Sequence, residues 1–173
     1  MNDHDDVFDD EEDDNIENTY LNFGIAGEDY AINVAYVTEI VRLQKIFSVP
    51  DVQNHIRGVI NLRGKVIPLL DVRARFGLPD APYDDRTVVV VIETNNSPTG
   101  LIVDGVYGIC ELPAEQVEPA PPAMRRAESS LVTGLGRRGD RVSFIIDVPT
   151  LVSTSGAATP RATEETRPTP SET

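Results

Sequence analysis

Short apolar runs separated by turn residues fill the chain between residues 18 and 152, and this spacing restricts the fold more than any other feature. Residues 20–25 alternate apolar and polar side chains, residues 27–29 form a turn, and residues 30–34 alternate again. Alternation with a period of two is typical of half-buried β-strands. Nine or ten such short runs favour small closed or nearly closed barrels over βαβ units.

Other segments complete this mainly β pattern. The run at 87–94 is almost entirely aliphatic and predicts a strand buried on both faces. Helical spacing of Val34, Val37, Ile40 and Val41 predicts one short amphipathic helix over 35–42. Asp71 is predicted to cap a short turn of helix over 72–76, and Pro149 to begin a terminal helix. Further strands are predicted at 58–62, 65–70, 99–103, 106–112, 131–135 and 141–147. This pattern leaves open one large barrel with a cavity or two five-stranded barrels without one.

Charge divides the chain into three parts. The net charge is −14, and residues 1–17 contain ten acidic residues and no lysine or arginine. We therefore predict a disordered acidic arm at 1–17, a folded domain at 18–152, and a disordered Ser/Thr/Pro-rich tail at 153–173. An acidic chain lacks the basic footprint that phosphate binding needs, which excludes a nucleic-acid partner.

The basic residues are thirteen arginines and only two lysines, Lys45 and Lys65. An acidic, lysine-poor chain is typical of a salt-rich cytoplasm, such as that of a halophilic archaeon, because salt screens self-repulsion. The alternative is a genome of high GC content, which also favours arginine over lysine.

If the source is a halophile, dilution from molar salt into low salt should unfold the protein reversibly, because unscreened acidic residues then repel one another. Circular dichroism across a salt series measures this transition. Equal stability at both salt concentrations would contradict a halophilic origin.

Reactive side chains are few. We predict no disulfide from the single cysteine, Cys110, which alternates with apolar neighbours as a core residue does. No zinc site, cofactor or secretory signal is expected, and no apolar run is long enough to span a membrane, so a cytoplasmic protein is expected. Asp71, Asp104 and Asp147 each follow an aliphatic strand. They would support a small-ligand-binding or hydrolytic barrel if they converged, and otherwise they cap or end strands.

One hairpin is more distinctive than these groups. Residues 58–62 and 65–70 are two apolar strands that meet at Arg63 and Gly64. Glycine permits a tight turn here, and the turn would hold Arg63 in a fixed direction. Arginine is favoured at protein interfaces because its planar donors pair bidentately. A solvated hairpin turn is the alternative from residue type alone.

The residues at 58–73, GVINLRGKVIPLLDVR, resemble the signature of CheW-like chemotaxis coupling proteins. DYAINV at 29–34 and VTEI at 37–40 are similar to the opening of that family. VDGV at 103–106, LPAEQV at 112–117 and PAP at 119–121 are similar to its second half, and GLG at 134–136 with GDR at 139–141 to its late turn. The acidic arm and the Arg137–Arg138 pair depart from the usual pattern.

This resemblance implies two packed five-stranded SH3-like barrels with one or two short helices. It also implies a non-enzymatic adaptor that couples the cytoplasmic tips of membrane chemoreceptors to the regulatory domain of the chemotaxis histidine kinase. No catalytic residue, metal or cofactor is implied. The receptor side would use Val37, Glu39, Gly58, Asn61, Leu62 and Arg63.

The kinase contact would be barrel against barrel, through apolar strand surface, and no single kinase-binding residue is assigned. Unequal barrel ends can meet heterologously and build rings or arrays with the kinase. The protein would be recruited to membrane receptor arrays without inserting into the membrane. The alternative within this family is an adaptor of another receptor–kinase pathway, such as surface motility.

Overall fold

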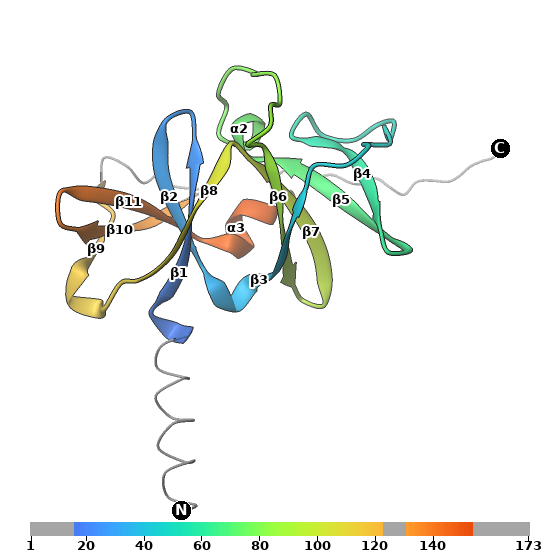
Figure 1. The fold of residues 1–173 in the computed structure, drawn as a ribbon. Coiled ribbons are helices and arrows are strands. Elements are labelled where there is room, and N and C mark those ends of the chain that lie inside the picture. Colours follow the sequence, from blue (N-terminus) through green and yellow to red (C-terminus); the bar gives the residue numbers. More distant parts are fainter. Residues whose placement is uncertain (1–15, 123–130, 154–173) are drawn as a thin grey trace, which may run out of the picture.

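The structure is a computed structural model that describes residues 16–122 and 131–153. The predicted acidic arm and the predicted tail therefore lie almost entirely outside the described residues. Between them, the chain forms two β-sheets that pack against each other (Figure 1). The prediction of a mainly β fold is confirmed.

The first sheet has six strands in the order β8-β1-β2-β11-β10-β9. In chain order they are β1 (Thr19–Ile25), β2 (Glu28–Asn33), β8 (Gly105–Glu111), β9 (Val117–Pro119), β10 (Val132–Arg138) and β11 (Arg141–Ile146). All neighbours are antiparallel except β2 and β11, which pair in parallel. We call this unit the first barrel, and it is built from both ends of the domain.

The second sheet has five strands in the order β3-β6-β7-β5-β4. They are β3 (Val37–Arg42), β4 (Ile56–Leu62), β5 (Lys65–Asp71), β6 (Val88–Thr94) and β7 (Ser97–Val103). An isolated bridge between Phe47 and Val59 joins the segment after β3 to β4, which closes the sheet on itself. This second barrel is one continuous stretch of chain, with a parallel pair of β5 and β7 that corresponds to the β2–β11 pair.

The largest apolar core lies between the two barrels. It combines buried side chains from β1, such as Phe23, with Leu101 of β7 and Leu151 of α3 (Val148–Val152), all of them fully buried. Each barrel also has a smaller cluster of its own, around Ile60 in the second barrel and around Leu112 in the first. Burial of large apolar side chains supplies most of the stabilisation of such folds, at about 1.5–3 kcal/mol each. The two barrels therefore depend on one shared interior.

The helix predicted over 35–42 is wrong. A 3-10 turn, η1 (Val34–Tyr36), is followed directly by strand β3. Along β3, Val37 and Val41 are half-buried whereas Ile40 is exposed, which is the alternation of a strand. Pairing with β6 decides the outcome, because it satisfies the backbone of this β-branched segment.

The other two predicted helices are confirmed. α2 (Val72–Arg75) begins after Asp71, whose carboxylate accepts a hydrogen bond from the backbone N–H of Ala74. α3 begins in the same way after Asp147. A further 3-10 turn, η2 (Ala114–Gln116), precedes β9. Over 16–122 and 131–153, no helix has the length and apolar character that crossing a bilayer requires.

Replacing Leu151 by alanine should lower the free energy of unfolding by about 2–5 kcal/mol, because it opens a cavity in the shared core. Both barrels should still unfold in one transition, measured by urea denaturation. Ile109→Ala is the control, since Ile109 is 67% exposed and its loss should change stability by only about 0.5 kcal/mol. Two separate transitions in the wild-type protein would contradict a shared core.

Candidate functional site

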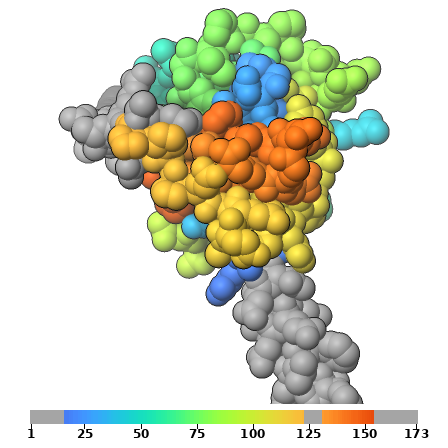
Figure 2. Space-filling model, turned by 90° about the vertical axis from the view of Figure 1, so that its left-hand side faces the viewer, coloured from blue at the N-terminus to red at the C-terminus, as the bar shows by residue number. Residues whose placement is uncertain are grey.

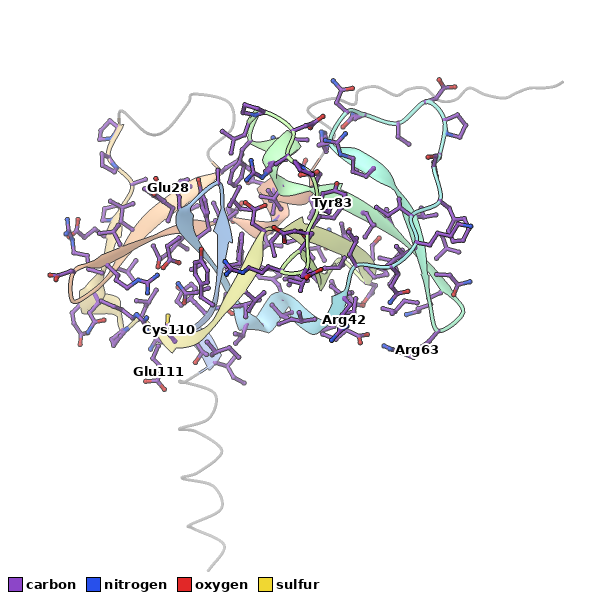
Figure 3. All side chains as sticks on the ribbon, turned by 45° about the horizontal axis from the view of Figure 1, so that its top comes forward. Glu28, Arg42, Arg63, Tyr83, Cys110 and Glu111 are labelled. Carbon is purple, nitrogen blue, oxygen red and sulfur yellow. The ribbon has the colours of Figure 1, made fainter. Side chains whose placement is uncertain are left out.

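The β4–β5 hairpin projects Arg63 into solvent at its tip. Arg63 and Gly64 form a two-residue turn in which both have positive φ angles, 54° and 87°. The side-chain oxygen of Asn61 accepts a hydrogen bond of 2.8 Å from the N–H of Gly64 and fixes this turn. The side chain of Arg63 is 68% exposed, and Figure 3 shows it at the outer end of the hairpin.

Asparagine and glycine fit such a turn at low cost, whereas an arginine in the left-handed region is strained. The β1–β2 hairpin has the same two-residue turn, with φ angles of 54° at Ala26 and 86° at Gly27. The conformation of Arg63 therefore follows from the type of turn, and its exposure and its ion pair are what distinguish this tip.

Glu39 of β3 pairs with this arginine. A carboxylate oxygen of Glu39 accepts a hydrogen bond from Nη2 of Arg63, so the ion pair connects β3 to a hairpin tip 24 residues further along the chain. Exposed pairs of this kind contribute about 0–1 kcal/mol to stability. The main consequence of the pair is geometric, because it limits the directions in which the guanidinium can point.

Gly58 sits where the hairpin meets the segment after β3. Its φ angle is 139°, at an irregularity in the β4–β5 pairing. A Cβ atom at this position would lie 2.3 Å from the carbonyl oxygen of Phe47. Phe47 uses that same oxygen to accept a hydrogen bond from the N–H of Val59, so the close approach is part of barrel closure. Glycine is required here for both its conformation and its size.

Leu62 and Val37 have supporting positions. Leu62 is buried in the core of the second barrel, directly beneath the tip that carries Arg63. Val37 begins β3, two residues before Glu39, and its half-buried side chain packs on the shared core. The structure thus places all six predicted receptor-side residues on β3 and the β4–β5 hairpin, and it brings Glu39 and Arg63 into direct contact.

Exposed apolar side chains that the motif did not identify lie on the same two elements as this ion pair. Val66 faces Asn61 across the hairpin and is 65% exposed. Ile40 follows Glu39 on β3 and is also exposed. The alternation of exposed Val66 with buried Ile67 is the sequence signal that could have identified this surface.

The three aspartates do not form a catalytic cluster. Asp71 caps α2 and accepts hydrogen bonds from Arg57 and Tyr83, while Asp147 caps α3. Asp104 pairs with Arg73 and accepts from the N–H of Ala26. Within the described part of the chain, no three His, Cys, Asp or Glu side chains are grouped to hold a metal ion. Cys110 is buried as expected, and burial raises the pKa of its thiol.

The family model of the CheW-like domain matches residues 19–155. The chain belongs to this family. The match extends over both barrels, so it confirms the resemblance that the motifs indicated.

Three relatives illustrate the similarity. The chain is 34% identical over 139 residues to the chemotaxis protein CheW of Klebsiella aerogenes, covering 80% of this chain and 84% of that protein. It is 34% identical over 125 residues to the chemotaxis protein CheW of Bacillus subtilis, covering 72% and 80% respectively. The scaffolding protein TtCheW from Thermoanaerobacter tengcongensis has a similar structure, with a TM-score of 0.70, 30% identity, and coverage of 75% of this chain and 88% of that one. The family, the relatives and the fold together support a chemotaxis scaffold.

Gly58→Ala should lower the free energy of unfolding by about 3 kcal/mol or more. The new Cβ would clash with the carbonyl oxygen of Phe47, and the positive φ angle would add backbone strain. Gly64→Ala is the matched control, since a Cβ at Gly64 meets nothing within 4 Å and strain alone costs about 1–2 kcal/mol. Chemical denaturation of both variants gives the comparison. If both variants lost the same free energy of unfolding, the contact between a Cβ at position 58 and the carbonyl oxygen of Phe47 would not contribute to the loss.

Proposed function

We propose that this protein is a non-enzymatic adaptor that couples chemoreceptors to the histidine kinase of a chemotaxis system. Its membership of the CheW-like family supports this role, as does the capping or pairing of the three candidate aspartates by structural hydrogen bonds. The single observation that carries the receptor side is the exposed Arg63 at the hairpin tip, held by Glu39.

The receptor contact proposed here is centred on the hairpin tip. A planar guanidinium can donate two parallel hydrogen bonds to a carboxylate or to backbone oxygens at the end of a helix. Exposed Val66 on the same hairpin offers apolar surface, which a receptor helix would cover. Gly58, Asn61, Leu62 and Val37 would maintain the shape of this surface from beneath.

The kinase contact is proposed to be of barrel against barrel. The segment after β3 carries exposed Phe47, Val49 and Val52 on the second barrel, which is apolar surface of the kind such a contact uses. The two ends of the molecule differ, so heterologous contacts with the kinase could extend into rings or arrays. A cytoplasmic protein recruited to receptor arrays follows from these partners, and an adaptor of another receptor–kinase pathway stays the alternative.

Arg63→Glu should weaken receptor binding about 30-fold, the loss that a hot spot of about 2 kcal/mol predicts. The unfolding free energy should change by less than about 1 kcal/mol, because the broken ion pair is exposed. Receptor co-sedimentation and receptor-dependent kinase activity measure the first effect. Arg42→Glu, an exposed arginine at the end of β3, is the control for added negative charge.

A second variant separates the guanidinium from the turn that carries it. Arg63→Asn should keep the left-handed turn at equal or higher stability, yet lose binding as Arg63→Glu does. Normal receptor control of the kinase in both variants would remove Arg63 from the proposed site.

A further inference from the structure

Two features of this chain have no part in the proposed receptor contact, namely the acidic segment at 1–17 and the arginines of the β10–β11 hairpin. The hairpin lies beside the β8–β9 region on one face of the first barrel (Figure 2). A pocket of about 110 Å³ opens there. Its lining residues are Asn22, Asp29, Tyr107, Gly108, Ile109, Cys110, Arg138 and Arg141.

Arg138 and Arg141 place two guanidinium groups at the mouth of this pocket, where they can bind anionic groups. Among the described residues of the lining, Asp29 is the one acidic residue, and its carboxylate oxygens already accept hydrogen bonds from Asn22 and Arg141. Arg141 is 61% exposed and keeps further donors, since it contacts Asp29 through one nitrogen. The side chain of Arg138 is exposed and makes no hydrogen bond or ion pair with any residue of 16–122 or 131–153, although its backbone pairs with that of Arg141.

Apolar surface lies next to these charges. Tyr107 and Ile109 of edge strand β8 are 56% and 67% exposed, although neighbouring Cys110 is buried. The guanidinium carbon of Arg141 lies 5.9 Å from the ring centre of Tyr107. An occupant of this face therefore needs acidic residues together with one or two apolar side chains.

The N-terminal segment has this composition and begins close by. Its ten acidic residues flank Val7 and Phe8. Thr19 pairs with Glu111, and Gly108 of the pocket is three residues further along β8, or about 10 Å away at the rise of a strand. Asn33 donates to the carbonyl of Glu17 at 2.9 Å and fixes the base of the segment. The fifteen residues before Ile16 can span about 50 Å when extended, so the pocket is within reach.

We propose that the acidic N-terminal segment docks within its own molecule on the face formed by Arg138, Arg141, Tyr107 and Ile109. The tether keeps the segment at a high effective concentration, which lets weak ion pairs act together. Salt screens these pairs, because the Debye length falls from about 10 Å at 0.1 M to about 3 Å at 1 M. Docking is therefore salt-dependent and covers the exposed side chains of β8.

Carbodiimide cross-linking of the full chain tests this proposal, since the reagent joins a carboxylate to an amine in direct contact. Arg138→Lys adds an amine to the face, whereas the two native lysines, Lys45 and Lys65, lie on the second barrel. Arg42→Lys is the matched control, because it adds one amine on the second barrel, also within reach of the segment. Cross-linked peptides are mapped by mass spectrometry in the monomer fraction.

The expected result is a cross-link from residues 3–14 to position 138 at about fivefold the yield found for position 42. In 1 M NaCl this excess should disappear. Neutralising residues 9–14 to Asn and Gln should also remove it. Equal yields at the two positions, cross-links confined to dimers, or an excess that persists in 1 M NaCl would each overturn the proposal, whether or not Arg63 binds receptors.

Discussion

The apolar interior shared by the two barrels is the interaction on which the rest of the structure depends. Each barrel alone encloses only a small cluster, and domains of that size bury too little surface to be stable without further support. The shared core adds buried side chains from both sheets and from α3. It turns two marginal units into one rigid body, from which the β4–β5 hairpin projects.

Rigidity of this body explains how the hairpin maintains costly local conformations. Arg63 occupies the left-handed region, and Gly58 approaches the backbone of Phe47 more closely than any other residue could. Strain of this kind persists only where neighbouring structure fixes it. Leu62, buried between these two positions in the chain, connects them to the core of the second barrel. The orientation of Arg63 is therefore determined by packing that lies beneath it.

Period-two alternation made most strands predictable, and the aliphatic run of β6 was correctly expected to be buried on both faces. The helix prediction for the segment after η1 was wrong because the residues of this segment pack into two different cores. Val37 packs on the shared core and Val41 on that of the second barrel, which produces a spacing that resembles a helix. The contact between Glu39 and Arg63 depends on tertiary pairing that no local pattern contains. Only the family resemblance indicated that they share an edge.

The distribution of charge is consistent with a protein that must expose apolar surface. Residues 18–152 contain 16 acidic and 13 basic residues, so the barrels are nearly neutral and the −14 of the chain comes mainly from its first 17 residues. Negative charge on the barrels themselves would oppose binding of acidic partners at Arg63 or Arg138. Concentrating it in a tethered segment keeps molecules apart through net repulsion, while the surface of the second barrel stays available for apolar and arginine-mediated contacts. A scaffold can thereby resist self-association and still carry exposed side chains such as Phe47 and Val66.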